Sequence, residues 1–357
     1  MKPNTYTVTL RPFVYSTPSV RTSSICICVS LLPQIIMLCM TKTYNALAVI
    51  FAAVLACLAA EGIYNFFKRT FSFSWLVALM QGVMIGLLLP AVYPPVGVFL
   101  IVLCSMMLTK YAFGGFSSSW VNPVAITVAL CYVLNMAIFP AFQITGADLQ
   151  ARNASFALIQ RGAFPLHQND ESVTNFLNDV VFKFFDMRIP EGYVSLFWDS
   201  GSIIPAFRFN VLTIITSLVL FAFEMIDILI PAVFLFTYAL LVRFLPASLL
   251  FSAKLNGDIL LAVLTSGTLF GTLFILQWYG TSPKTLWGKL LYAFFGGIAA
   301  FFIVGYGMSP IGYIFTVLVM NLVSPVLQVF EQHQVKQKLH KNLMPRLKSL
   351  YEEAHYE

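Results

Sequence analysis

The sequence predicts an all-α integral membrane protein with about ten transmembrane helices, in two halves that are related as an inverted repeat and contain broken helices. Of its 357 residues, 59% are hydrophobic and 10% are charged, and the mean hydropathy is +0.83. Soluble domains carry about 25% charged residues. The apolar runs provide roughly ten segments near the 20 residues that a helix needs to cross a bilayer. Glycine and proline interrupt these runs at similar places in the two halves, which indicates an internal repeat.

The predicted spans fall into two groups of five, separated by a long polar region. The first five cover residues 23–40, 45–66, 75–91, 96–109 and 121–142, and the last five cover 209–223, 229–244, 259–278, 287–304 and 311–330. This divides the chain into a first half with an N-terminal arm (1–142), an external region (143–207), a second half (208–330) and a basic tail (331–357). A polar region of this length between spans is typical of a functional or folded segment.

The basic residues of the short segments predict that both termini lie in the cytoplasm, under the positive-inside rule. Lys68, Arg69 and Lys110 follow this pattern, whereas Lys42 and Arg243 run against it. Residues 1–19 have no cleavage pattern after a short apolar core, so we expect the first span to be retained. The net charge of +6 is thereby explained by topology. It does not indicate nucleic-acid binding.

The stretch from residue 82 to residue 125 is apolar but contains breaks that no straight helix would have. Such breaks leave backbone N–H and C=O groups without hydrogen bonds, and a bilayer tolerates these groups only where protein or a polar cavity provides partners. A second segment, Gly267-Thr-Leu-Phe-Gly271, repeats the pattern Gly82-Val-Met-Ile-Gly86. Two interpretations remain open, a midplane binding site between repeats and simple close packing of helices at GxxxG. The predicted broken-helix core consists of Gly86, Pro90, Gly114, Gly115, Asn122, Pro123, Gly267 and Gly271.

The ionisable residues indicate no self-contained catalytic or metal site. Acids inside spans mark ion pathways, but Glu61, Glu224 and Asp227 lie close to predicted helix ends, and we favour a solvated or structural role for them. The four histidines fall outside the spans, which argues against a hydrolase with a Ser/His/Asp or Cys/His set. The six cysteines form no CxxC pair and are typical of small packing residues. An iron–sulfur or metal role would need thiolates from separate helices.

Several short motifs, taken together and in order, resemble the RnfD/NqrB family. These proteins are membrane subunits of the ion-translocating Rnf and sodium-pumping NADH:quinone oxidoreductase complexes. The motifs are MIGLLLP at 84–90, KYAFGG at 110–115, VNPVA at 121–125, YVSLF at 193–197, GSI at 201–203, Asp227 with Pro231, and VLVMNLVSP at 317–325. The resemblance extends from about residue 11 to residue 328.

The resemblance implies an RnfD-like subunit of the bacterial cytoplasmic (inner) membrane that relays electrons coupled to Na⁺ or H⁺ transport. Its implied partners are other subunits of the complex, which carry flavin and iron–sulfur groups, and it would be inactive alone. It also implies FMN attached as a phosphoester to a threonine in the pattern D-G-x-S-G-A-T-P-L. Thr174 stands at that position in this sequence. A second flavin is a further implication.

The sequence departs from the family pattern at specific positions. Gln168 stands where the attachment motif has its leading acid, and Val173 replaces the small residue before the threonine. Trp278 stands at a second acidic position of the family pattern, and Arg208 lies near a third. An ordinary loop threonine, and a flavin-free small-solute transporter or channel, therefore remain as alternatives. For the tail, residues 332–350 predict a basic amphipathic helix on the membrane surface or, alternatively, one that docks a soluble partner.

Overall fold

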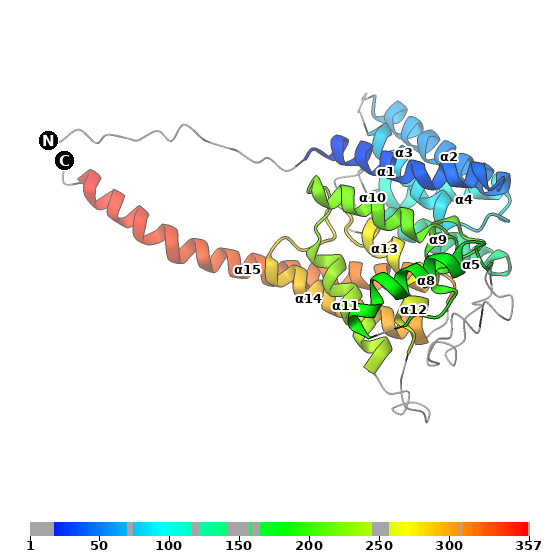
Figure 1. The fold of residues 1–357 in the computed structure, drawn as a ribbon. Coiled ribbons are helices and arrows are strands. Elements are labelled where there is room, and N and C mark those ends of the chain that lie inside the picture. Colours follow the sequence, from blue (N-terminus) through cyan, green and yellow to red (C-terminus); the bar gives the residue numbers. More distant parts are fainter. Residues whose placement is uncertain are drawn as a thin grey trace, which may run out of the picture.

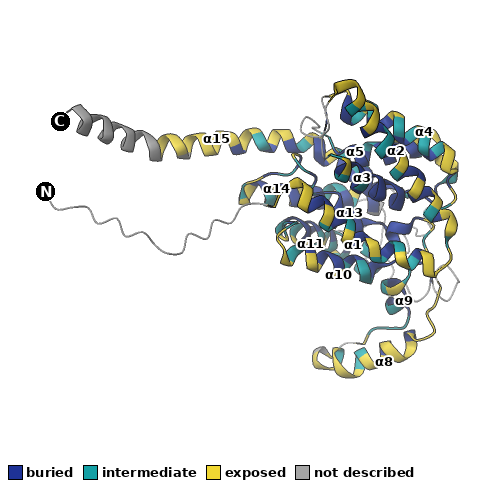
Figure 2. Ribbon diagram, turned by 90° about the horizontal axis from the view of Figure 1, so that it is seen from above, coloured by how far each residue is buried: buried dark blue, intermediate teal, exposed yellow. Residues whose placement is uncertain are grey.

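The computed structural model describes a helical protein whose central helices are buried by shorter and longer helices around them (Figures 1 and 2). It describes residues 18–69, 74–113, 115, 121–140, 158, 165–186, 188–244, 257–306 and 309–355. Within these residues the regular elements are all helical. Large apolar side chains are exposed on the outer faces, for example Val29 on α1 (Val20–Met40) and Phe51 on α2 (Tyr44–Lys68). Such surfaces fit a lipid environment.

The helices follow the predicted order. In the first half, α1 and α2 precede α3 (Trp75–Leu88), α4 (Pro95–Met106), the π-helical turn η1 (Met107–Tyr111), α5 (Pro123–Leu134) and the 3₁₀ turn η3 (Met136–Ile138). The region between the halves (143–207), for which the sequence predicts an external location, contains α8 (Asp170–Val180), η4 (Phe182–Phe185), α9 (Tyr193–Trp198) and η5 (Pro205–Phe207). The second half contains α10 (Asn210–Ala222), α11 (Leu229–Phe244), α12 (Ile259–Thr265), α13 (Thr268–Phe274), α14 (Leu286–Ala300), the π-helical turn η7 (Phe301–Tyr306) and α15 (Gly312–His355).

Within the described part of the chain, four helices are long and apolar enough to cross a membrane. They are Val20–Met40, Tyr44–Lys68, Leu286–Val304 and Gly312–Lys341. The helices at the other predicted spans are shorter, with 14 residues in α3, 12 in α5 and 13 in α10. A helix of that length covers only about two thirds of a bilayer core. Ten complete spans therefore stay a prediction, although every predicted span coincides with a helix or a helix pair.

The two halves share an order of elements. In each, an early helix packs against the penultimate helix of that half, as α2 does with α4 and α11 with α14. α4 and α14 both end in a π-helical turn, and α5 and α15 follow after a break. The first helices of the halves, α1 and α10, pack against each other. This common order supports the prediction of two related halves, while their inverted relation stays a prediction.

The glycines of the first repeat segment allow α2 and α3 to pack backbone to backbone. A Cβ added at Gly82 would lie 2.6 Å from the Cα of Val54, and one at Gly86 would lie 2.5 Å from the Cα of Ile50. α3 is buried along most of its length, from Met80 to Leu88 (Figure 2). For this half, the structure therefore favours the close-packing interpretation of GxxxG.

The basic tail continues the last span as part of α15, so the boundary at residue 330/331 lies inside a helix. α15 runs past the bundle without a break in its helical backbone (Figures 1 and 2). Where it leaves the bundle, Glu331 accepts hydrogen bonds from Thr285 N (2.8 Å) and Lys284 N (3.3 Å) at the start of α14. The tail is therefore a continuation of the last predicted span and not a separate helix.

We expect Gly86→Ala to destabilise the protein by about 1–3 kcal/mol, because the new methyl group meets backbone that cannot move independently. Gly62→Ala is the matched control, since a Cβ at Gly62, also within a helix, meets no described atom within 4 Å. It should stabilise α2 by up to about 1 kcal/mol. Thermal unfolding of the two purified variants in one detergent measures the difference, and equal melting temperatures would contradict the close α2–α3 packing.

Candidate functional site at the junction of the two halves

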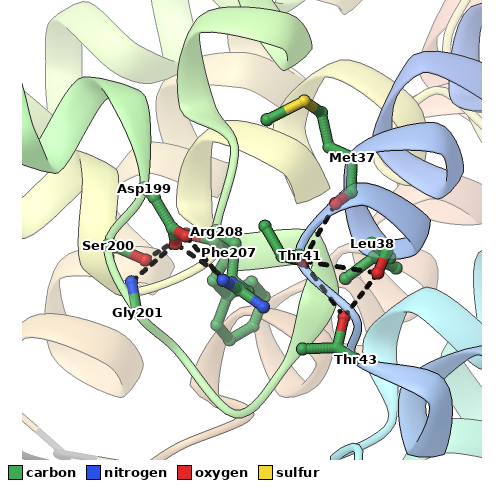
Figure 3. Close-up of polar contacts among 9 residues, drawn as sticks. All are labelled: Met37, Leu38, Thr41, Thr43, Asp199, Ser200, Gly201, Phe207 and Arg208. Carbon is green, nitrogen blue, oxygen red and sulfur yellow. Dashed lines mark hydrogen bonds and ion pairs between the residues drawn. The ribbon is translucent and has the colours of Figure 1, made fainter.

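A loop from Asp199 to Arg208 connects α9 to α10, and polar contacts between its own residues close it (Figure 3). Arg208 closes the loop through an ion pair with Asp199, with Nη2 2.5 Å from Oδ2 and Nε 3.0 Å from Oδ1. Ser200 Oγ donates to Phe207 O at 2.6 Å. Arg208 lies near a position where the family pattern has an acid, and its guanidinium pairs with the carboxylate at the other end of the loop.

This loop reaches the helix breaks on both sides. Ala91 N, directly after Pro90 and beyond the end of α3, donates to Ile203 O at 3.0 Å. Phe207 packs against Gly267, where an added Cβ would lie 2.1 Å from the ring. The loop thus satisfies a backbone group freed by the break in the first half and fills the space beside the break in the second.

Asn122 connects the two broken regions directly. Its Oδ1 accepts from Val124 N (3.0 Å) and Ala125 N (3.4 Å), which caps the start of α5. Its Nδ2 donates at 3.0 Å to Ile275 O, just after α13. One fully buried side chain therefore satisfies three backbone groups at helix ends from both halves. Pro123, the first residue of α5, supplies no N–H that would need a partner.

Gly267 lies at the break between α12 and α13, and Gly271 lies within α13. Gly267 adopts φ +72°, in the left-handed region that favours glycine. A Cβ at Gly271 would lie 1.9 Å from the ring of Tyr313 on α15. These glycines admit aromatic side chains, whereas Gly82 and Gly86 admit the backbone of α2. The glycine spacing of the first half thus recurs in the second half, but the glycines of the two segments pack against different partners.

The remaining predicted core residues lie apart from this junction. Gly115 adopts φ +103° beside Tyr64, and a Cβ there would lie 3.3 Å from the Tyr64 hydroxyl. Gly114 lies outside the described residues, as does most of the segment 143–164. The junction is therefore connected by three contacts: Ala91, after Pro90, with Ile203; Asn122, before Pro123, with Ile275; and Gly267 with Phe207, Gly271 lying one helical turn further on.

Glu61 is buried, which excludes the solvated role and leaves the structural one of the two roles expected for it, and its carboxylate belongs to a polar cluster. Only 3% of Glu61 is exposed, and Lys110 Nζ lies 3.2 Å from its Oε2. Tyr111 and Gln81 complete the cluster. Glu61 and Lys110 are 49 positions apart in the sequence, and only the packing of α2 against α4 and η1 brings them together.

Asp227 lies in the turn between α10 and α11 and forms an ion pair with Lys289 of α14. Its Oδ1 accepts from Leu229 N at 2.9 Å, and Gln277 exchanges two hydrogen bonds with its backbone. Burial raises the pKa of Asp227, but the hydrogen bonds from Lys289 and Leu229 and the Lys289 charge outweigh that effect, so the net pKa lies below its ordinary value of 3.8. The carboxylate therefore fastens α11 to α14 in its ionised form.

Thr174, the predicted flavin attachment residue, lies on α8 with only 3% of its surface exposed. Its hydroxyl donates to Asp170 Oδ1 at 3.1 Å. A phosphoester would remove that proton and place phosphate charge beside a carboxylate, which repels it. In this arrangement the residues around Thr174 do not fit a covalently bound FMN.

Asp170 is the residue that sequence reasoning missed. It is 1% exposed, and its carboxylate accepts from Gly192 N (2.9 Å), Ser195 N (2.7 Å) and the Ser195 hydroxyl. Tyr193 follows Gly192 in the sequence, and its hydroxyl donates at 2.6 Å to Asp258, the N-cap of α12. The sequence signal that could have identified Asp170 was an acid at the start of a helical stretch between the two halves. Its partners 22 and 25 positions away could not be predicted locally.

The fold and the junction define a multi-pass α-helical membrane protein whose interrupted helices meet at the centre. The chain belongs to the NQR2, RnfD, RnfE family, whose model matches residues 7–337. It is also similar to a component of the Na(+)-translocating ferredoxin:NAD(+) oxidoreductase complex of Acetobacterium woodii, with 27% identity over 85 residues. That similarity spans 24% of this chain and 27% of the relative.

We expect Asn122→Ala to destabilise the protein by about 2–3 kcal/mol, because it removes both an N-cap and a buried bond to Ile275 O. Asn122→Ser keeps a capping oxygen and should lose about half as much. Ser19→Ala, which removes the exposed cap of α1, is the control for an N-cap outside the junction. Thermal unfolding measures all three, and an Asn122→Ser loss equal to that of Asn122→Ala would contradict a capping role.

The Asp227–Lys289 pair should make stability depend on acid pH. Because the folded pKa of Asp227 is depressed, its contribution is present above the unfolded pKa and is lost as the pH falls through the folded pKa. Asp227→Asn should therefore unfold at a lower temperature than the native protein at neutral pH, and this difference should shrink below about pH 4. Glu224→Gln, an exposed acid in the same turn, should show no such convergence. A difference that stays constant with pH would contradict the assignment.

Proposed function

We propose that this chain is an RnfD-type membrane subunit of an ion-translocating electron transport complex, coupled to Na⁺ or H⁺ movement in the bacterial cytoplasmic membrane. The family match over residues 7–337 is the observation that carries the proposal. The name of the Acetobacterium woodii relative agrees with it. In this role the chain works together with flavin- and iron–sulfur-carrying subunits.

The junction supports a scaffold role within such a complex. Broken helices allow polar backbone to face the interior of a membrane protein only when each freed group has a partner. Ile203 of the 199–208 loop provides the partner at the break in the first half, and Asn122 provides the partner for Ile275 in the second half. A movement of the external region would be transmitted to both breaks through this loop, which is how we infer that events outside the membrane affect the central helices.

The proposal assigns no step to a flavin on Thr174. Covalent FMN, as the resemblance implies, would require α8 to turn Thr174 away from Asp170 before attachment. The enclosure of Thr174 is also the observation that favours a second candidate function, a flavin-free small-solute transporter or channel of the same fold. That function would need no other protein for activity.

Purification of the tagged chain from its native membranes tests these functions. We expect the other complex subunits to co-purify with it. In inverted vesicles, we expect deletion of the chain to abolish redox-driven ²²Na⁺ uptake or acidification of the lumen, because electrons then have no path that couples to ion movement. If the chain purifies alone, and proteoliposomes containing it alone take up a solute, the transporter function replaces the first proposal.

In-gel flavin fluorescence of the same preparation tests attachment at Thr174. The chain is produced with its native flavin-attaching enzyme, and a protein with an intact D-G-x-S-G-A-T-P-L segment serves as the positive control. From the contacts of Thr174 we expect a dark wild-type band. A fluorescent band that disappears in Thr174→Ala, and persists in Ser172→Ala on the exposed side of α8, would contradict the enclosed arrangement.

A further inference from the structure

A pocket of about 630 Å³ opens where α15 passes the start of α14 (Figure 1). One wall is formed by residues 280–285, which precede α14, and the other by one face of α15. Gln328, Glu331, Val335 and Leu339 of α15 line it at intervals of three or four positions, so they share one side of the helix. We call this space the tail pocket. Its volume is in the range that binds small ligands.

Hydrogen bonds hold the two walls of the tail pocket together. Gln328 Nε2 donates at 3.0 Å to Gly280 O and at 3.1 Å to Ser324 Oγ. Ser324 Oγ in turn donates to Thr281 O. Two side chains of α15 thus fasten the segment before α14 at a fixed distance. A ligand that enters a preformed pocket avoids the cost of ordering its walls.

Two lysines line the tail pocket from its opposite walls. Lys284 precedes α14, Lys336 lies on α15, and both are exposed. Among the described residues, neither forms an ion pair with a carboxylate, whereas Lys289 of α14 is paired with Asp227. Clefts lined by charge of one sign concentrate ligands of the opposite sign. The two lysines therefore predict an anionic ligand.

Glu331 also lines the tail pocket, but its carboxylate serves α14. It is 9% exposed and accepts hydrogen bonds from Thr285 N (2.8 Å), Thr285 Oγ1 (2.5 Å) and Lys284 N (3.3 Å). These donors lie at the start of α14, where the helix dipole favours a negative charge. Since this end of the helix holds the carboxylate, the ammonium groups of Lys284 and Lys336 stay available to a ligand.

The surroundings of the tail pocket fit the boundary between lipid tails and headgroups. α14 with η7 and the first part of α15 are two of the helices long and apolar enough to cross a membrane. Leu286 and Trp287, at the start of α14, are exposed beside the pocket. Tryptophan is enriched at membrane interfaces, and the predicted topology places this end of both helices in the cytoplasm.

We propose that the tail pocket binds the headgroup of an anionic phospholipid, with its phosphate between Lys284 and Lys336 and its acyl chains along Leu286 and Trp287. Basic pockets between membrane helices on the cytoplasmic side suit such headgroups. An acidic protein segment would satisfy the lysines but would leave the apolar side chains uncovered, so we favour the lipid. The inference goes beyond the proposed function and applies equally to an electron transport subunit and to a transporter.

Quenching of tryptophan fluorescence by brominated lipid tests the proposal, because Trp287 lies beside the pocket. The full-length chain is placed in phosphatidylcholine vesicles with increasing fractions of brominated phosphatidylglycerol or brominated phosphatidylcholine. We expect the wild type to prefer phosphatidylglycerol. The double variant Lys284→Gln/Lys336→Gln should lose about fivefold of this preference for each lysine, the factor that about 1 kcal/mol corresponds to.

Two further variants make the result specific to the tail pocket. Lys68→Gln/Arg69→Gln removes the same charge from exposed residues at the end of α2, on the same predicted side of the membrane, and should keep the preference. Trp287→Phe removes the reporter and should abolish the quenching that is specific to phosphatidylglycerol. Equal melting temperatures of the wild type and the lysine variants in phosphatidylcholine vesicles show that the exposed substitutions leave the fold intact.

Three results would overturn the proposal. The first is an equal preference in the wild type and in Lys284→Gln/Lys336→Gln. The second is phosphatidylglycerol-specific quenching that survives Trp287→Phe, because the lipid would then bind elsewhere. The third is binding of oligo-glutamate that requires both lysines, without any preference for phosphatidylglycerol. In that case the tail pocket would be a docking site for an acidic protein segment.

Discussion

The hydrogen bonds of Asn122 are the interaction on which the centre of the molecule depends. Helices that stop inside a membrane protein leave N–H and C=O groups that lipid cannot satisfy. Asn122 satisfies two N–H groups at the start of α5 and the carbonyl of Ile275 beyond α13. Because those ends belong to different halves, the same side chain that makes each break tolerable also fixes the halves relative to each other.

The external region adds a second connection to this centre. Asp170 holds α8 to the start of α9, and Tyr193 of α9 bonds the N-cap Asp258 of α12. Asn210, at the start of α10, donates to the carbonyls of Leu196 and Leu264. These bonds span residues far apart in sequence and tie the external helices to the broken pair α12 and α13. A region of this kind acts as a folded part of the second half, and its burial of Thr174 is a consequence of that anchoring.

The sequence predicts the helical membrane architecture well, because apolar runs and their glycine and proline breaks are local features. Every predicted span contains a helix, and Asn122, Pro123 and Gly267 lie at helix ends as expected. The site was predicted only in outline. The pairing of Glu61 with Lys110 depends on contact between separate helices, and the role of Gly86 depends on whether a cavity or a helix faces it. The burial of Thr174 depends on the long-range partners of Asp170.

The equivalent positions of the two halves show how they have diverged. η1 and η7 are both π-helical turns that end the penultimate helix of their half. The turn Met107–Tyr111 carries Lys110, whereas Phe301–Tyr306 reads FFIVGY and contains no lysine or carboxylate. The second half instead has the partly exposed pair of Asp227 with Lys289, and the buried Glu331, which accepts from Thr285 at the start of α14. A buried charge is stable only where several polar groups surround it. The first half provides such a setting around Glu61 and Lys110, while the charges of the second half fasten its helices together.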